Sequence, residues 1–375
     1  MLETVFNRLE QGAERIRAGE FLGFDLMLIY TFVLLALTGL VLSFAAGPVA
    51  AARLGIADAF YFTNRHILFV AATVIVTVGT ALLSQTQARR LGLLAAICSL
   101  ITIVLVLAVG PEIKGAQRWL HLFGFSLQPS EFLKPGFICA AAWFLSARKE
   151  DHFPGALACL ALYGVSSLLL LMQPDYGQWL LLTAVWAVMF FVAGWNWAWI
   201  AGLGSAASGA LGLGYLTQGH VKERIDRFID PSSGDTYQTS KATEAISSGG
   251  VFGHDLHEAP GVKYSLPDAH TDFVYAVAVE EFGLLVGILI IALFAIIAAR
   301  GVLAAIRTED MFLRTALAGL TAVLTLQACI NIGVNVGVLP AKGMTLPFIS
   351  SGGSSMLATG FTAGLLLAFS RKRRS

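Results

Sequence analysis

Long runs of apolar residues, each bounded by charge, glycine or proline, recur from one end of this chain to the other. One bilayer crossing needs about 20 predominantly apolar residues, and only 13% of the residues are charged, well below the share in a soluble domain. We therefore expect an all-α polytopic membrane protein, a single membrane-embedded domain over 1–375. The predicted transmembrane helices, about ten, are 23–46, 63–84, 91–110, 130–147, 155–172, 178–194, 197–217, 273–299, 313–334 and 351–370.

The positions of Lys and Arg predict the orientation of these spans. With the N-terminus inside, the inner segments include clusters such as Arg89-Arg90, whereas the short outer loops are poor in cations. The positive-inside rule then places both termini in the cytoplasm. Residues 1–20 form a cytoplasmic segment in this topology, with 2–17 a candidate amphipathic helix, and 371–375 form a basic cytoplasmic tail. The cations of the short outer loops are Arg53, Arg65, Lys114, Arg118 and Lys342.

One polar segment, 218–271, is far longer than the other connections and falls on the outer, periplasmic side. Loops of this length are usually functional or disordered. Apolar residues spread through the segment argue against disorder, so we expect a folded cap over an outward-facing cavity. These apolar residues are Phe228, Ile229, Val251, Phe252, Tyr264 and Leu266.

Charge and cysteine content exclude two further classes of protein. The net charge is +1 and the sequence lacks glycine-rich phosphate loops and zinc-finger spacings, so nucleic acid is not an expected partner. All four cysteines lie inside apolar runs, which predicts buried thiols and not a disulfide framework. They are Cys98, Cys139, Cys159 and Cys329.

Ionisable residues within predicted spans are functional candidates, because each costs several kcal/mol unless it is paired or hydrated. Glu131 and Lys134 are three residues apart, a spacing that allows an ion pair locking the helix end or a pair facing substrate. Asp272 precedes the eighth span, where Thr271 or Asp272 can act as a helix N-cap or Asp272 as a general base. For Glu280 and Glu281 the sequence leaves open pairing with cations of the inner half or of neighbouring helices, or a role in the local field.

Cations on the outer side have two readings. A scatter of solvated charges needs no partner, whereas cations that converge on one cavity would bind an anion such as pyrophosphate, with arginine giving bidentate contacts. An anionic lipid head group is then the natural ligand. The residues concerned are Lys114, Arg118, Arg224, Arg227, Lys263 and Lys342.

Several motifs occur in order over the whole length, and together they resemble the SEDS family (shape, elongation, division and sporulation). Within that family, the Lys342-Gly-Met-Thr-Leu-Pro stretch resembles the cell-division branch more than the elongation branch. Two positions depart from the family pattern: Asp268 stands where glutamate is frequent, and Ser351 where tyrosine is usual. The motifs are GAQRW at 115–119, QPSEFLK at 128–134, QPDYG at 173–177, RIDRFIDP at 224–231, LPDAHTDF at 266–273 and KGMTLPFIS at 342–350, followed by Gly352-Gly353-Ser354.

The resemblance implies a peptidoglycan glycosyltransferase that polymerises lipid II into β-1,4-linked glycan strands during septal wall synthesis. Asp272 matches the family's aspartate and would be the general base that activates the acceptor hydroxyl in an inverting reaction. The cations would stabilise the undecaprenyl pyrophosphate leaving group. The expected substrate-binding residues are Lys114, Arg118, Glu131, Lys134, Arg224, Lys263, His270 and Lys342.

The same resemblance implies partners and location. The partners are lipid II, the growing glycan strand, a class B penicillin-binding protein, other division proteins and membrane lipid, at the septum of the cytoplasmic (inner) membrane. No cofactor is required, although a divalent cation, Mg or Mn, has candidate oxygen ligands in Glu131, Asp175 and Asp272. No metal site is assigned, since His254 and His257 lack a third ligand. The alternatives are a lipid II flippase, which should show paired halves with broken helices, or an elongation-type polymerase.

Overall fold

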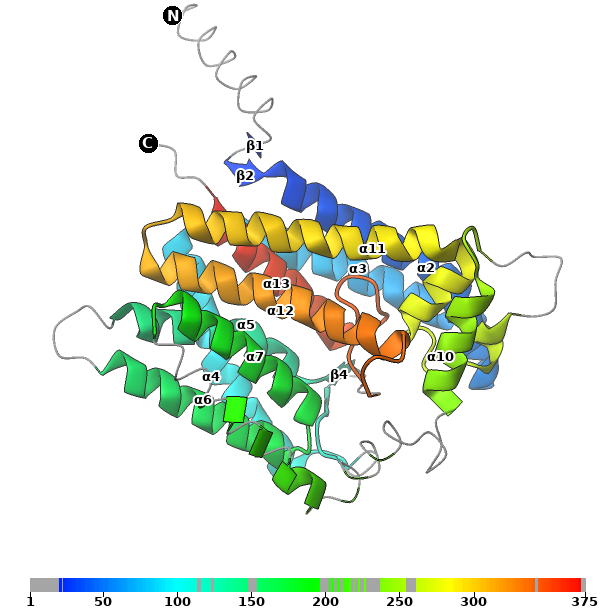
Figure 1. The fold of residues 1–375 in the computed structure, drawn as a ribbon, viewed down its shortest axis with the longest axis horizontal. Coiled ribbons are helices and arrows are strands. Elements are labelled where there is room, and N and C mark those ends of the chain that lie inside the picture. The colour runs from blue at the N-terminus through cyan, green and yellow to red at the C-terminus, as the bar shows by residue number, and fades with distance from the viewer. Residues whose placement is uncertain are drawn as a thin grey trace, which may run out of the picture.

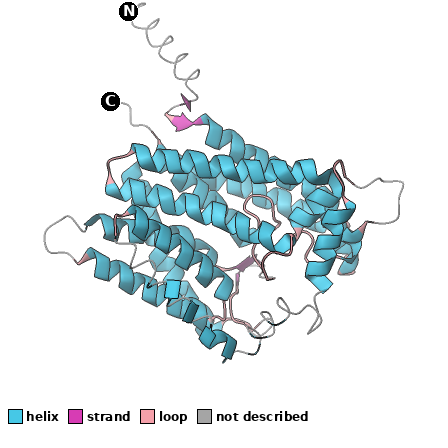
Figure 2. Ribbon diagram, in the orientation of Figure 1, coloured by secondary structure: helices cyan, strands magenta, loops and turns pink. Residues whose placement is uncertain are grey.

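The computed structural model describes residues 20–21, 23–112, 116–122, 125–147, 154–195, 237–253, 261–340 and 343–371, with scattered positions between 202 and 226. In this part of the chain the fold is almost entirely helical, with two short β-hairpins (Figure 2). The helices are α2 (Leu26–Arg53), α3 (Tyr61–Ala81), α4 (Gln85–Val109), α5 (Pro129–Ser146), α6 (Gly155–Met172), α7 (Tyr176–Val192), α10 (Tyr237–Ser248), α11 (Val274–Arg307), α12 (Met311–Asn335) and α13 (Gly353–Ser370), with a 3-10 turn at Val262–Ser265. The hairpins pair β1 (Glu20–Phe21) with β2 (Phe24–Asp25), and β3 (Leu120–Leu122) with β4 (Phe125–Leu127).

Seven of the described helices are long and apolar enough to cross a membrane: α2, α3, α4, α6, α11, α12 and α13. The predicted all-α membrane fold is therefore confirmed. Helix α7 has 17 residues, and α5 contains Glu131 and Lys134, which lower its hydropathy. Each predicted span except 197–217 coincides with one of these helices, and that range falls largely outside the described residues.

The helices run side by side, so that the bundle has two distinct ends (Figure 1). The start of α2 and the end of α13 lie at one end, where Asp25 and Arg371 line a common pocket. The β3–β4 hairpin, α10 and the segment between α12 and α13 lie at the other, which we call the hairpin end. The described segments that were predicted to lie on the outer side, such as the end of α2 and the start of α3, are found at the hairpin end.

Small residues let neighbouring helices approach closely, as is common in membrane bundles. A Cβ atom on Gly360 would lie 2.8 Å from the Thr73 side chain, and one on Gly364 would lie 2.6 Å from Thr80, so α13 packs tightly on α3. Gly136 of α5 similarly lies against the backbone of Ala96 in α4. Helices α5, α12 and α13 supply much of the buried core.

The segment before α13 folds back into the bundle. A Cβ atom on Gly39, near the middle of α2, would lie only 2.6 Å from the carbonyl oxygen of Phe348. Non-helical backbone at this depth is tolerated only where protein covers it, and Met344, Phe348 and Ile349 are all buried. This segment therefore places its backbone carbonyl groups inside the bundle, where Gln327 and Asn331 of α12 donate to them.

The described part of the long loop is folded, as expected. Helix α10 and the 3-10 turn pack on α11 through buried residues such as Ala245 and Leu266. Helix α11 is broken at Gly283, whose φ is +82°, and Leu284 donates its backbone N–H to the carbonyl of Gly250 instead of to its own helix (3.0 Å). The kink therefore frees a backbone N–H of α11 to hydrogen-bond the long loop at Gly250.

Some expectations from the sequence are corrected. Cys139 and Cys159 are buried, but Cys98 and Cys329 are exposed on outward helix faces, because an apolar run in a membrane helix has a lipid-facing side as well as a packed side. Helix α4 begins at Gln85, six residues earlier than predicted, because Ser84 and Gln87 form a capping box. In the loop, Leu266 is buried, whereas Val251, Phe252 and Tyr264 are exposed.

Several predicted features lie outside the described residues: the N-terminal segment, including 2–17; most of the basic tail; Phe228 and Ile229; His254 and His257; and the cations Lys114, Arg224, Arg227 and Lys342.

Candidate active site

A buried ion pair lies one turn inside α5 at the hairpin end. The Nζ atom of Lys134 is 2.8 Å from Oε2 of Glu131, and about 4% of each residue is exposed. Pro129 begins the helix, and the i,i+3 spacing places both side chains on one face. The ion-pair reading of these two residues is therefore confirmed.

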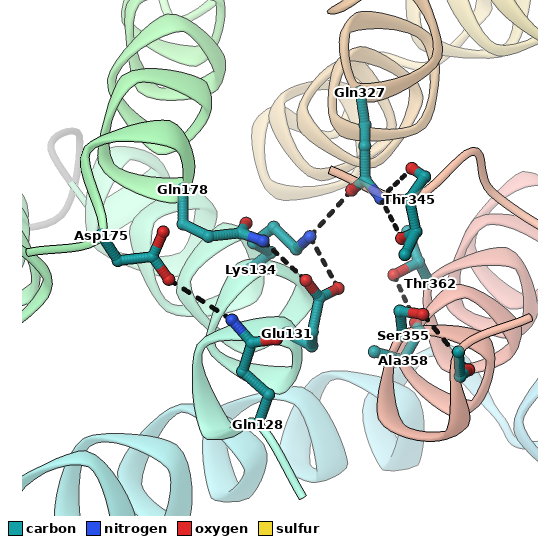
Figure 3. Close-up of polar contacts among 11 residues, drawn as sticks. Gln128, Glu131, Lys134, Asp175, Gln178, Gln327, Thr345, Ser355, Ala358 and Thr362 are labelled. Atoms are coloured by element: carbon teal, nitrogen blue, oxygen red, sulfur yellow. Dashed lines mark hydrogen bonds and ion pairs between the residues drawn. The ribbon is translucent and has the colours of Figure 1, made fainter. Parts of the chain in front are cut away.

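Amide side chains extend this ion pair in both directions (Figure 3). Gln178 of α7 donates to Oε1 of Glu131 at 2.6 Å, and Lys134 donates to Oε1 of Gln327 in α12 at 2.8 Å. Gln327 in turn donates to the backbone oxygen of Thr345 at 3.0 Å. We call this chain of five residues the polar layer; it connects α7, α5, α12 and the segment before α13.

Asp272 lies in a tight turn shaped by Asp268. Asp268 has a φ of +52°, and its carbonyl accepts the N–H groups of Thr271, Asp272 and Phe273 at 3.0, 3.1 and 3.3 Å. Aspartate tolerates this left-handed conformation better than most residues because its short side chain can hydrogen-bond locally. The departure from the family's glutamate therefore falls at a position where aspartate suits the backbone.

Two asparagines of α12 fix the backbone of Asp272. The Nδ2 atoms of Asn331 and Asn335 lie 2.8 and 3.0 Å from its carbonyl oxygen, and Asn331 also donates to the carbonyl of Met344 at 2.6 Å. Asn335 accepts the N–H of Ala276 at 3.0 Å. Because one helix face holds both backbone segments, the position of Asp272 relative to the 343–346 segment is set by α12.

The carboxylate of Asp272 faces this segment. A Cβ atom on Gly343 would lie 3.3 Å from Oδ2 of Asp272, and a small pocket of about 30 Å³ is lined by both residues and by Asn331 and Gln238. Helix α11 starts at Val274 with Phe273 as its N-cap residue and no side-chain cap, so the N-cap reading of Thr271 or Asp272 is wrong. Asp272 lines the pocket and does not cap α11.

His270 lies on the other side of the same turn. Its ring is 4.5 Å from the ring of Phe62 in α3, and its carbonyl accepts the N–H of Ser351 at 2.9 Å. Burial lowers the pKa of His270, although Asp268 opposes the shift. The imidazole is consequently neutral at physiological pH.

Arg118 is held at the start of α7. It donates to the carbonyls of Gln173 and Pro174, and its guanidinium is 3.8 Å from the carboxylate of Asp175. Gln128 donates to Asp175 at 3.3 Å. Burial raises the pKa of Asp175 and the Arg118 charge opposes that shift.

Lys263 clamps the long loop onto α11. Its Nζ forms an ion pair with Glu281, and its backbone N–H donates to Glu280 at 2.9 Å. The sequence left open pairing of Glu280 and Glu281 with cations of the inner half or of neighbouring helices, but the observed cation belongs to the long loop. A role of the two glutamates in the local field stays a prediction. Lys263 therefore lies in a loop-to-helix contact, separate from the polar layer.

Helix α12 connects the main sequence candidates: it bonds α5, which carries Glu131 and Lys134, and the turn that carries His270 and Asp272. Arg118 lies at the start of α7, beside Asp175. Lys342 itself lies outside the described residues, but its neighbour Gly343 lies against Asp272.

The candidate metal ligands do not form a common site. Glu131 is bound by Lys134 and Gln178, while Asp175 is bound by Gln128 and lies beside Arg118. Among the residues that the structure describes, no three His, Cys, Asp or Glu side chains converge as metal ligands. This donor set does not fit a divalent cation held jointly by Glu131, Asp175 and Asp272.

Three neutral amides of α12 that hold the site together were not predicted, because only charged residues were considered as candidates within the spans. Gln327, Asn331 and Asn335 follow one another at four-residue spacing in an otherwise apolar span, which places all three on one helix face. That spacing is a signal that the sequence contains. The distant partners of these amides, Lys134 and the backbone of Asp272, are not visible without the fold.

Comparisons with known proteins agree over nearly the whole chain. Residues 25–375 match the profile of the family of FtsW, RodA and SpoVE, described as "Cell cycle protein". The probable peptidoglycan glycosyltransferase FtsW of Caulobacter vibrioides is 43% identical, over 93% of this chain and 90% of the relative. Stage V sporulation protein E of Bacillus subtilis is 33% identical, over 93% and 98%.

Solved structures show the same fold. A chain from a peptidoglycan synthase complex that coordinates polymerization and crosslinking has a TM-score of 0.78 at 27% identity, covering 94% of this chain and 98% of that one. The rod-shape-determining protein RodA of Thermus thermophilus has a TM-score of 0.70 at 27% identity, with the same coverage.

Proposed function

This chain belongs to the FtsW, RodA and SpoVE family of cell cycle proteins, and we propose that it is a peptidoglycan glycosyltransferase that polymerises lipid II during cell division. The resemblance to the SEDS family is thereby confirmed. The 43% identity to a probable peptidoglycan glycosyltransferase FtsW supports the division branch. The observation that carries the mechanism is the Asp272 carboxylate, which faces a pocket while its backbone is fixed by α12.

In this mechanism Asp272 is the catalytic residue. Its carboxylate takes the proton of the acceptor sugar hydroxyl as the hydroxyl oxygen attacks the anomeric carbon of the donor. The bond from that carbon to the lipid diphosphate breaks, and the diphosphate leaves with the electron pair. A single displacement inverts the configuration and requires one base, so α→β inversion is compatible with one carboxylate here.

The polar layer positions groups around that base. Lys134 is satisfied by Glu131 and Gln327, so its main effect is to fix Gln327, which holds Thr345. Asn331 holds Met344 and Asp272 together. A base held within a fraction of an ångström of the productive geometry gains much of its rate advantage from that positioning. Lys342 precedes Gly343 in the chain, and we propose that it contacts the lipid diphosphate.

Two of the remaining cations, Arg118 and Lys263, have structural partners as well as proposed roles. Arg118 and Lys263 fix the start of α7 and the long loop, and thereby shape the approach to the site. Lys114 and Arg224 complete the proposed contacts with the lipid diphosphate, and His270 contributes through the turn that it shares with Asp272.

We place the hairpin end on the outer face of the cytoplasmic membrane, with both termini inside, as the charge distribution predicts. The proposed partner is a class B penicillin-binding protein at the division septum. The structural similarity to a chain of a peptidoglycan synthase complex supports such an assembly.

The test is polymerisation of lipid II by the purified chain with its penicillin-binding partner. Asp272→Asn should abolish glycan polymer while expression and partner binding persist. Glu112→Gln, at another acidic residue of the hairpin end, is the matched control and should polymerise normally. Polymer formed at normal rate by Asp272→Asn would remove the assigned base. An inactive wild type that translocates lipid II without ATP would instead favour a flippase.

A further inference from the structure

The N-terminus of α13 lacks the usual capping. The helix begins at Gly353 with Gly352 as its cap residue and no side-chain cap. Among the described residues, the backbone N–H groups of Gly353, Ser354 and Ser355 have no acceptor, while Gly352 and Gly353 are partly exposed. Such N–H groups and the helix dipole favour an anion, but a helix end alone does not identify a ligand.

Arg65 has no carboxylate partner among the residues that the structure describes. It lies four residues after the start of α3, is half-buried, donates to Tyr61 Oη at 3.0 Å and stacks on the rings of Tyr61 and Phe69. The described structure shows no ion pair to it. At the same end of the bundle, Arg118, Lys134 and Lys263 each lie beside an acidic residue.

Phe69 connects Arg65 to the helix end. The guanidinium carbon of Arg65 is 6.0 Å from the centre of the Phe69 ring, and the tip of that ring is 2.7 Å from a Cβ atom built on Gly353. A side chain at Gly353 would therefore displace the ring on which Arg65 stacks. Because residue 353 is glycine, the Phe69 ring can lie between Arg65 and the N-terminus of α13.

His66 lies on the same face of α3 as Phe69, and its ring nitrogens have no hydrogen-bond partner among the described residues. Phe62 contacts His270, whose carbonyl binds Ser351, and Phe69 contacts Gly353, so His66, between them on the same face of α3, is directed toward the 351–353 segment. It is 0% exposed, and neither ring nitrogen has a hydrogen-bond partner. Buried polar atoms in native structures are almost always satisfied, so two unpaired nitrogens on the helix face that is directed toward the 351–353 segment favour binding of a polar ligand there.

This place is continuous with the candidate active site. Thr345 accepts hydrogen bonds from Gln327 of the polar layer at its backbone carbonyl and at its hydroxyl. Its side-chain methyl group lies 3.5 Å from a Cβ atom built on Gly352. On the other side, Ser350 donates to the carbonyl of Thr271, the residue before Asp272. Figure 3 shows Thr345 between Gln327 and the start of α13.

We propose that Arg65, His66 and the N-terminus of α13 form the subsite for the diphosphate group of the lipid-linked sugar donor. This inference rests on the proposed function, because an inverting transfer needs the leaving group within about one sugar of the base. Arg65 supplies bidentate contacts to phosphate oxygens, and the free N–H groups neutralise the charge that develops when the bond breaks. The assignment moves the leading diphosphate contact away from Lys134 and Arg118, whose charges are already paired.

The experiment measures binding without catalysis. The full-length chain is placed in nanodiscs of neutral phosphatidylcholine, and binding of undecaprenyl diphosphate, undecaprenyl monophosphate and undecaprenol is titrated. Arg65→Gln should weaken diphosphate binding about 10- to 100-fold, as expected for a charge-assisted bidentate contact, and should leave undecaprenol binding unchanged. Arg53→Gln is the matched control, since Arg53 is exposed at the end of α2 and donates to the carbonyl of Ser265. The Arg53→Gln variant should bind undecaprenyl diphosphate like the wild type.

Two further variants guard against a folding defect. Arg65→Lys keeps the charge but loses the bidentate geometry and should bind with intermediate affinity. His66→Leu removes the unpartnered nitrogens, so it should unfold at the same or a higher temperature and yet bind diphosphate more weakly. Unaltered diphosphate binding by Arg65→Gln would overturn the subsite.

The source of the phosphate and the proposed function are tested separately. Competition by phosphatidylglycerol vesicles at equal potency would show that Arg65 only contacts ordinary lipid head groups, which also overturns the proposal. Asp272→Asn should bind undecaprenyl diphosphate normally. In polymerisation, Arg65→Gln should raise KM for lipid II more than it lowers kcat. Intact, Arg65-dependent binding by a chain that makes no polymer would refute the glycosyltransferase and leave the subsite standing.

Discussion

Lys134 and Glu131 form an ion pair at 2.8 Å in which only 6% and 5% of the two side chains are exposed. Burying two charges is costly, and the pair is tolerable because Gln327 and Gln178 satisfy the remaining donor and acceptor atoms. Removal of one partner would leave the other charge uncompensated in a dry site.

Lys134→Met should therefore lower the free energy of unfolding by about 3–5 kcal/mol. The matched control is Lys241→Met, because Lys241 pairs with Glu244 at the same i,i+3 spacing on α10, but with both side chains partly exposed. An exposed pair contributes about 0–1 kcal/mol. Thermal unfolding in detergent compares the two variants, and equal losses would contradict a special role for burial.

Asn331 positions Asp272 without being placed in contact with the reacting atoms. Asn331→Ser removes the bonds to the carbonyls of Asp272 and Met344, so we expect kcat to fall about 10- to 100-fold. KM for lipid II should change little. The exposed Asn64 of α3 gives the control Asn64→Ser, and steady-state polymerisation separates the two parameters. A change confined to KM would show that Asn331 acts on binding instead.

The kink in α11 depends on Gly283. Its φ of +82° disfavours any side chain, and a Cβ atom would lie 2.2 Å from the carbonyl oxygen of Val251. Gly283→Ala should destabilise the chain by about 1–3 kcal/mol from backbone strain alone and loosen the contact between α11 and the long loop. Gly79→Ala, at a helical glycine with open space around it, should be neutral or stabilising by up to about 1 kcal/mol. Limited proteolysis within 237–265 reports the loosening, and equal protection of both variants would argue against it.

Stability should fall as the pH decreases through the range where His270 would be protonated in the unfolded chain. Burial holds its folded-state pKa below the usual value of 6.5, so below about pH 6.5 the unfolded chain binds more protons than the folded one. The contribution is present above that pH and lost beneath it. Between pH 7.5 and 5.5 the melting temperature of His270→Gln should fall less than that of the wild type. His121→Gln, at an exposed histidine, should follow the wild type, and parallel curves for all three would exclude His270 as the cause.

Much of the architecture follows from local sequence. Runs of apolar residues predicted the helices because a bilayer crossing imposes a minimum length on each, and α6 spans 155–172 as expected. The predicted helix ends were less accurate, because the start of α4 depends on the Ser84 capping box. The break inside α11 at Gly283 was not predicted. Helix α5 is not among the seven helices that are long and apolar enough to cross a membrane, because Glu131 and Lys134 lower its hydropathy. These two charged side chains are buried through packing against neighbouring helices.

By itself, the sequence determined that this chain spans the membrane repeatedly, which residues are costly there, and that Asp272 and its motifs resemble one family. Each of these properties depends on residues close together in the chain. Only the tertiary structure decided which cations are already paired, that Asn331 and Asn335 hold Asp272 from 59 and 63 residues away, and that the ring on which Arg65 stacks lies against Gly353. The physical reason is that charge pairing and hydrogen-bond satisfaction depend on distances between helices, and helix packing alone fixes those distances.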